Sequence, residues 1–184
     1  SNLDAALKDS LRWEIRDALK SAGVPAIWVT HDQEEALSVG DRVGILNNGK
    51  LEQLDTPEAC FCEPASRFVA RFLGEASFLP GKLNPDDNSV KTTLGTAPGI
   101  PVNNASGNVD LLVRPDDVSL ILDETGNGEI DWVRYEGAAR FYAVNLDDGT
   151  SVKIRTSHEN KAEPGDRVKL VITTTHPLAV FDRL

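Results

Sequence analysis

The sequence contains no methionine, only two cysteines, and no long apolar stretch. Its apolar runs fall far short of the about 20 residues that a bilayer-spanning helix needs, and its start does not read as a secretory signal. Because even position 1 is serine, we expect a fragment or a processed chain. A hydrophobic share of 40% suffices for a packed core, which predicts a soluble globular protein with one large or two small domains.

Cysteine and histidine are too sparse for a disulfide scaffold or a metal site. The cysteines are Cys60 and Cys62, and the three histidines, His31, His158 and His176, are isolated and far apart. Zinc would need further ligands at characteristic spacing. We therefore expect no metal, and two buried or half-buried thiols.

The chain also lacks a basic region. Its formal charge is −10, with 13 acids against 8 bases in residues 1–75 and 16 against 11 in residues 76–184. Clustered Lys and Arg supply most of the affinity for nucleic acid, so this balance argues against a nucleic-acid partner.

The first part of the chain has helical periodicity. Apolar residues recur every three or four positions over residues 3–22, with the charged side chains, Arg12, Arg16 and Lys20 among them, on the other faces. Gly23 and Pro25 mark the end of this helix. The apolar run at residues 26–29 then predicts a strand of a parallel sheet, covered on both faces.

Further short elements follow. Asp32 and Glu35 form a capping pair for a second helix that stops by Gly40. The Asn-Asn-Gly-Lys sequence at 47–50 predicts a type I′ hairpin between apolar strands. Two more short helices are predicted after Thr56 and Ser66.

From about residue 76 the pattern changes to short β-rich runs, which suggests a barrel or sandwich. A three-residue hairpin loop is predicted at 147–149, and residues 84–107 are interpreted as a long loop or weak hairpin. The predicted domains are therefore residues 1–75 and 76–184. The predicted strands are 109–113, 118–122, 130–135, 139–146, 151–156, 168–173 and 178–181.

The first domain resembles the ATPase subunits of ABC transporters. Residues 27–36, Ile-Trp-Val-Thr-His-Asp-Gln-Glu-Glu-Ala, resemble the switch region of these ATPases, and Ser-Asn-Leu-Asp at 1–4 resembles their D-loop. Residues 41–53 are similar to the strand pair that follows the switch. The stretches 56–58, 64–70 and 72–74 are similar to the linker helices of importer-type subunits.

The second domain resembles the oligonucleotide-barrel-like regulatory domain (TOBE) of the same importers. Arg-Pro-Asp-Asp-Val at 114–118 is similar to its Arg-Pro-Glu-Asp-Val segment, and 135–137 and 164–168 fit the same pattern. The expected fold class is thus an α/β fragment of an ABC nucleotide-binding domain followed by an all-β OB-like barrel.

The resemblance assigns two site residues. A histidine directly after a parallel strand lies at the ligand-binding edge of an α/β sheet, and the resemblance implies that His31 contacts the γ-phosphate of ATP. Asp4 matches the D-loop aspartate, which helps couple the two ATP sites across the dimer. Gln33 and Glu34 are interpreted as solvated helix positions.

Phosphate-loop and signature motifs do not occur in this sequence. We therefore expect ATP and Mg²⁺ to serve a longer parent protein, and this chain alone to bind no cofactor and to be inactive. The alternative is a stand-alone regulatory or small-ligand module without ATPase activity.

The resemblance also implies partners. They are a second copy of the subunit, a membrane permease and, indirectly, a substrate-binding protein, which would place the chain in the cytoplasm on the inner face of the membrane. The exposed edges of a partly open barrel would give a reason to pair. Residues 72–81 resemble the junction in iron(III) importers, so ferric iron is the expected substrate, with polyamine, sulfate and sugar open.

Overall fold

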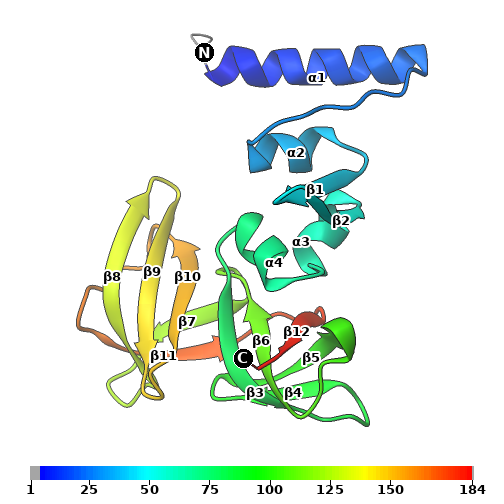
Figure 1. The fold of residues 1–184 in the computed structure, drawn as a ribbon. Helices are drawn as coiled ribbons and strands as arrows, with labels where there is room; N and C mark the ends of the chain where they lie inside the picture. Colours follow the sequence, from blue (N-terminus) through cyan, green and yellow to red (C-terminus); the bar gives the residue numbers. More distant parts are fainter. Residues whose placement is uncertain (1–4, 184) are drawn as a thin grey trace. The chain divides into compact units, whose positions relative to one another are not determined.

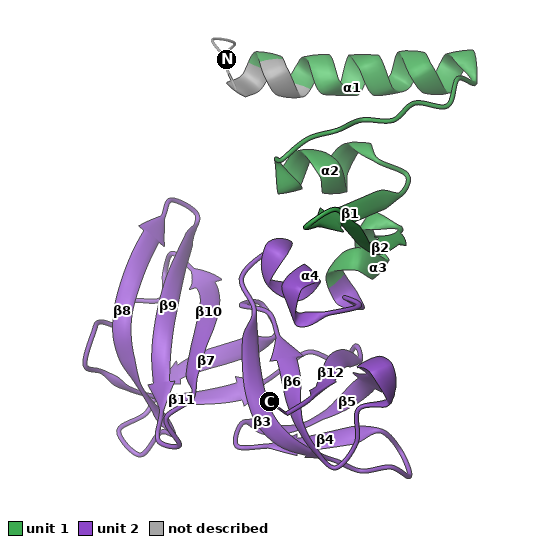
Figure 2. Cartoon of the chain, in the orientation of Figure 1, with its two compact units in different colours: residues 1–61 green, residues 62–184 purple. Residues whose placement is uncertain are grey.

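The computed structural model describes residues 5–183. They divide into two compact units, residues 1–61 and 62–184 (Figure 2). The first unit is largely helical with one small hairpin, and the second is almost entirely β (Figure 1). Compactness thus groups residues 62–75 with the β-rich part. The domain boundary after Glu75 concerns independent folding and stays a prediction.

The first unit contains three helices and a hairpin. Its elements are α1 (Ala5–Ala22), α2 (Gln33–Val39), β1 (Val43–Asn47), β2 (Lys50–Asp55) and most of α3 (Pro57–Cys62). Asn48 and Gly49 both have positive φ, 48° and 77°, so the predicted type I′ turn is confirmed. Cys60 in α3 is buried, and its thiol donates to the Val43 carbonyl at 3.6 Å. Burial raises the pKa of this thiol.

The predicted parallel strand at residues 26–29 is wrong for the described part of the chain. These residues form no ladder with any other described residue. Ile27 is 95% exposed and Val29 88% exposed, while Trp28 is 40% exposed. A strand needs hydrogen-bonded neighbours on its edges, and the described residues supply none for this segment.

Salt bridges join α1 to the segment around α2. Arg16 donates from Nε to the Val39 carbonyl at 3.1 Å, and Lys20 Nζ lies 2.7 Å from Asp41 Oδ1. The hydrogen bond and charge of Lys20 lower the pKa of Asp41. The sequence predicts the basic residues of α1 on faces other than its apolar one. Arg12, Arg16 and Lys20 form a stripe at four-residue spacing that meets α2 and its flanks.

The second unit contains a closed five-stranded barrel. Its strand order is β12-β5-β4-β3-β6, and the parallel pairing of β5 with β12 completes the circle. This mostly β, closed architecture fits the expected OB-like barrel. The strands are β3 (Ser77–Leu83), β4 (Ser89–Thr92), β5 (Gly95–Pro101), β6 (Asn108–Val113) and β12 (Leu178–Asp182).

A five-stranded antiparallel sheet is inserted between β6 and β12, in the order β10-β9-β8-β11-β7. Leu79 and Leu111 of the barrel share one buried cluster with Ile130 and Tyr142 of this sheet. The barrel and the sheet therefore fold around a common core. The strands are β7 (Val118–Leu122), β8 (Gly128–Glu136), β9 (Ala139–Leu146), β10 (Ser151–Ser157) and β11 (Arg167–Ile172).

Of the two interpretations of residues 84–107, the hairpin is confirmed and the long loop is wrong. The segment contains β4, β5 and a short 3-10 turn (Val102–Asn104), and β4 and β5 form a regular antiparallel hairpin within the barrel. Glycine here serves close packing rather than flexibility. A Cβ on Gly99 would lie 2.6 Å from Val180 Cγ2, and one on Gly81 2.7 Å from Val90 Cγ1.

The expectation of a partly open barrel is also wrong. The barrel is closed, and the outer edge of β10 in the second sheet is occupied. The Lys153 N–H donates to Ser77 Oγ at 3.0 Å, and the Arg155 N–H donates to the Pro115 carbonyl at 2.9 Å. Edge-to-edge strand pairing along these positions is therefore blocked.

Helix α4 (Arg67–Phe72) packs on the barrel, and it begins as predicted, with Ser66 Oγ accepting from the Val69 N–H. Arg67 donates to Asp110 Oδ2 and to the Asp182 carbonyl, both at 2.7 Å. Its guanidinium also lies 4.6 Å from the centre of the Phe78 ring.

Candidate functional site

The candidate site is the corner where the segment of residues 26–31 leads into α2. Asp32 caps this helix, since its Oδ1 accepts from the Glu35 N–H at 3.1 Å. The Thr30 hydroxyl accepts from the Asp32 N–H at 3.0 Å and donates to Glu35 Oε2. The predicted capping pair of Asp32 and Glu35 is therefore present, and the backbone is fixed on both sides of His31.

One arginine of α1 reaches this corner. Arg12 Nε lies 2.9 Å from Glu35 Oε1, and its Nη2 lies 3.6 Å from Asp32 Oδ2. The hydrogen bond from the Glu35 N–H lowers the pKa of Asp32, and the positive charge of Arg12 lowers it further. The corner is thus a network of two carboxylates, one guanidinium and one hydroxyl.

His31 itself is exposed at the rim of this network. A hollow of about 340 Å³ adjoins it, lined by apolar and charged side chains of α1 and of the corner, namely Leu11, Arg12, Ile15, Trp28, Thr30, His31, Asp32 and Glu35. An exposed imidazole on a fixed backbone can donate a hydrogen bond to an oxyanion such as a phosphate. Among residues 5–183, no group of three His, Cys, Asp or Glu side chains is arranged to hold a metal ion.

The sequence also singled out Gln33, Glu34 and Asp4 in this part of the chain. Gln33 is half-buried and Glu34 is exposed on the first turn of α2, close to their interpretation as solvated positions. Asp4, the predicted D-loop residue, lies outside the described residues. Sequence reasoning did not assign Arg12 to the site. Its only signal was the four-residue spacing of Arg12, Arg16 and Lys20 ahead of an acidic helix start.

The Arg-Pro-Asp-Asp-Val segment at 114–118 contacts α4 and the residues that follow it. Arg114 is buried, and its Nη1 donates to the carbonyls of Ala70 at 2.7 Å, Glu75 at 3.1 Å and Gly74 at 3.3 Å. Burial lowers the pKa of Arg114, and the charge of Asp117 opposes that shift. The motif thus fastens the end of α4 to the barrel.

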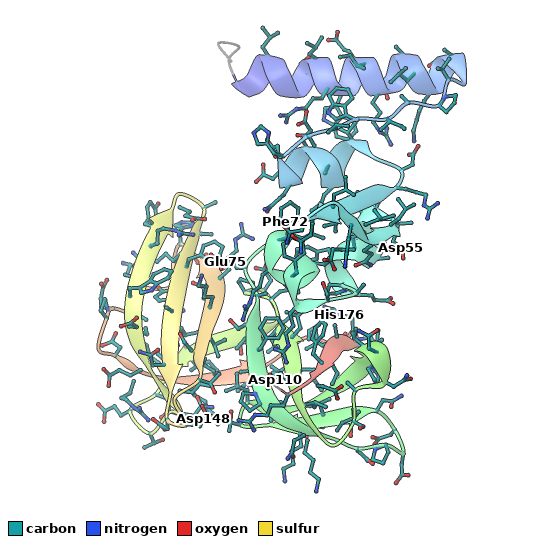
Figure 3. All side chains as sticks on the ribbon, in the orientation of Figure 1. Asp55, Phe72, Glu75, Asp110, Asp148 and His176 are labelled. Carbon is teal, nitrogen blue, oxygen red and sulfur yellow. The ribbon has the colours of Figure 1, made fainter. Side chains whose placement is uncertain are left out.

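Asp117 completes this turn. Its Oδ2 accepts from the Arg114 N–H at 2.6 Å, and its Oδ1 lies 3.2 Å from His176 Nε2. The His176 side chain is more than half exposed. This residue is labelled in Figure 3. The Arg114 turn is therefore a structural latch, which joins α4 to the barrel and to the residues just before β12.

Comparison with known proteins matches the second unit to a family. Residues 111–180 fit the TOBE domain. This TOBE match begins within β6 and ends within β12, so it includes the Arg114 turn and the whole inserted sheet. The family resemblance proposed for the β-rich half is thereby supported.

The chain as a whole is similar to ATP-binding proteins of importers. It is 37% identical over 163 residues to the spermidine/putrescine import ATP-binding protein PotA of Marinobacter nauticus, covering 83% of this chain and 43% of the relative. It is 35% identical over 179 residues to the xylose/arabinose import ATP-binding protein XacK of Haloferax volcanii, covering 91% and 46%.

A third relative, PotA of Mesorhizobium japonicum, is 32% identical over 183 residues, covering 94% of this chain and 50% of the relative. The chain thus spans half or less of the length of these curated relatives. No helix among the described residues is long and apolar enough to cross a membrane.

Proposed function

We propose that this chain is the C-terminal part of the ATP-binding subunit of an ABC importer. The observation that carries the proposal is the exposed His31 on a fixed corner, within a sequence that aligns with import ATP-binding proteins over more than four fifths of this chain. The TOBE match over residues 111–180 adds the second domain of such a subunit.

In this function His31 donates a hydrogen bond to the γ-phosphate of ATP as charge develops in the transition state. Asp4 acts as the D-loop aspartate toward the second subunit. The sequence has no phosphate loop. We propose that residues of a longer subunit hold the nucleotide and Mg²⁺.

His31→Ala in such a full-length subunit is expected to lower ATP hydrolysis by about a hundredfold or more, the scale for losing one donor to a developing charge. A steady-state phosphate-release assay measures this. The matched control is His158→Ala, an exposed histidine of the second unit, which should hydrolyse normally. Near-normal turnover of His31→Ala would remove the role proposed for His31.

The chain alone is expected to show no ATPase activity above background, because it has no phosphate loop. The same assay on the purified 184-residue chain tests this. Mg²⁺-dependent turnover that disappears in His31→Ala would contradict it, and would also favour a self-sufficient enzyme over the proposed fragment.

The partners proposed are a second copy of the subunit, a membrane permease and, through it, a substrate-binding protein. This arrangement places the chain on the cytoplasmic face of the membrane. The names of the relatives refer to spermidine/putrescine and to xylose/arabinose, and ferric iron gains no support from them. Uptake assays with a polyamine, a pentose and ferric iron, in cells with and without the gene, decide the substrate class.

A further inference from the structure

The residues on both sides of His31 contact one residue, Glu35. Its Oε2 accepts from the Thr30 hydroxyl, and its backbone N–H donates to Asp32. The Thr30 hydroxyl has a single proton, so donating to Glu35 leaves its lone pairs to accept from the Asp32 N–H. The Glu35 side chain therefore orients the Thr30 hydroxyl, which in turn accepts from the Asp32 N–H, while the Glu35 backbone binds the Asp32 carboxylate.

Glu35 is in turn held by Arg12 of α1. The Glu35 side chain is 13% exposed and the Arg12 side chain 20% exposed, and their atoms Oε1 and Nε lie 2.9 Å apart. Arg12 also approaches Asp32, so it is the cation between two neighbouring carboxylates. Without Arg12, the largely buried carboxylate of Glu35 would lie near the negative charge of Asp32 without this guanidinium to offset the repulsion, which would cost folding free energy.

The other cations of the α1 stripe cannot replace Arg12. Arg16 bonds to the Val39 carbonyl and Lys20 to Asp41, at the opposite end of α2. They contribute to the packing of α1, and their hydrogen bonds and ion pairs are with Asp17, Val39 and Asp41. Arg16 is therefore a natural control for Arg12, on the same helix, one turn further along, with the same charge.

We propose that Arg12 is a positioning residue for His31. Through Glu35 it fixes Thr30 and Asp32, and so the backbone from which the imidazole projects. The proposal deepens the function proposed above and rests on it for the consequence in catalysis. The geometric part, that Arg12 determines the position of His31, stands apart from any reaction.

The geometric part is tested by NMR on the 184-residue chain without nucleotide. The imidazole C–H signals of His31 are assigned by their loss in His31→Ala. Arg12→Gln should displace and broaden these signals, whereas Arg16→Gln should leave them in place. Arg12→Lys should restore the wild-type position in part, because a lysine supplies the charge but not the planar guanidinium fork.

The proposal is overturned if the His31 signals do not move in Arg12→Gln. It is also overturned if Arg16→Gln displaces them as much as Arg12→Gln does, because the effect would then come from the packing of α1 as a whole. If circular dichroism shows that Arg12→Gln loses helical content, the same NMR measurement is made on Glu35→Gln, which leaves the sequence of α1 unchanged. A displaced His31 signal in Glu35→Gln then supports the proposal, and an unmoved one overturns it.

The catalytic consequence is measured in the full-length subunit. Arg12→Gln is expected to lower kcat by about tenfold or more with little change in KM for ATP, since misplacing a reacting group costs rate rather than ground-state binding. Arg16→Gln should stay within about twofold. If His31→Ala hydrolyses ATP normally, the proposed function fails, while the NMR result on Arg12 is unaffected. A normal kcat in Arg12→Gln beside an impaired His31→Ala overturns the positioning role.

Discussion

Single residues decide how firmly α4 is held to the barrel. Arg114 is the most connected of them, because its buried guanidinium satisfies three carbonyls at the end of α4 and in the linker to β3. Its contact with the Ala70 carbonyl is buried, and its contacts with the Gly74 and Glu75 carbonyls are partly buried. Arg155, which is half exposed and 3.6 Å from Asp116, is a surface ion pair in comparison.

Arg114→Met is therefore expected to lower the free energy of unfolding by at least about 2 kcal/mol, since each buried polar group left unpaired costs about 1–3 kcal/mol. Arg155→Met should cost at most about 1 kcal/mol, the range for an exposed pair. Urea unfolding of the 184-residue chain, followed by circular dichroism, measures both. Equal effects would contradict the buried latch.

Asp147 gives a pH-dependent contribution to stability. Arg167 binds both of its carboxylate oxygens, at 2.8 and 3.0 Å, and this hydrogen bonding lowers the pKa of Asp147. The folded pKa lies below the unfolded value of about 3.9, so the contribution is complete above about pH 4 and lost as pH falls through the folded pKa.

Asp147→Asn should therefore reduce the steepness with which Tm falls below pH 4. The measurement is a series of thermal melts from pH 2 to 7. Glu124→Gln, on an exposed turn of the same unit, is the control and should keep the wild-type slope. An unchanged slope in Asp147→Asn would show that the Arg167 pair does not persist in solution.

Among the elements, α4 has an unusual position, since it precedes the β-rich sequence yet is fastened to it. Arg67 bonds to β6 and to the end of β12, and Arg114 reaches back from the turn after β6 to the α4 carbonyls. Lys153 of β10 also bonds to Glu75 at 2.6 Å, just ahead of β3 (Figure 3). The barrel therefore gains support from residues before the predicted boundary.

A fragment of residues 62–184 should accordingly be more stable than one of residues 76–184, although both are expected to fold. The difference should appear as a higher Tm and a higher urea midpoint, because the shorter fragment leaves Arg114 and Asp110 without their α4 partners. Equal midpoints would place the folding boundary after Glu75, as the sequence predicts.

Most elements could be predicted from local patterns. The hairpin at 47–50 and the caps at Asp32 and Ser66 depend on residues close in sequence, and those predictions are confirmed. Strand β3 was missed, and β4 and β5 were expected only as a loop or a weak hairpin, because Pro and Gly normally interrupt strands. Whether Gly99 marks a loop or makes room for Val180 depends on a strand about 80 residues later, which local patterns cannot reveal.

The residues of the candidate site also differ in how far the sequence alone could predict them. His31 could be proposed as a site residue from its neighbours Thr30 and Asp32 in the sequence, and its role stays a prediction. The role of Arg12 could not, because the partner of a helix arginine is set by how two elements pack. The strand at 26–29 failed for a related reason, since a continuous apolar run indicates burial without naming the elements that bury it.

At the scale of the whole molecule, the two units differ in how well each buries its apolar residues. The second has a continuous core of barrel and sheet. The first exposes Ile27 and Val29 almost fully, together with Leu46, Leu51 and Leu54 of its hairpin. Apolar surface of this kind does not stabilise a small unit in water.

Residues 1–61 alone are therefore expected to lack a cooperative thermal transition and to bind a hydrophobic dye, whereas residues 62–184 unfold cooperatively. Circular dichroism melts and dye fluorescence of the separated units measure this. The expectation fails if residues 1–61 melt cooperatively, or if residues 62–184 are the unfolded half.

The closure of the barrel by β12 has a consequence for biosynthesis. β5 and β6 are made early, but β12, which lies between them in the finished barrel, emerges only after the 64 residues that separate Val113 from Leu178. At about 5–20 residues per second the ribosome needs roughly 3 to 13 s for that stretch. During this interval the edges of β5 and β6 that pair with β12 in the finished barrel have no partner strand. The nascent chain can therefore bind chaperones or pair incorrectly through these edges, whereas the finished barrel cannot.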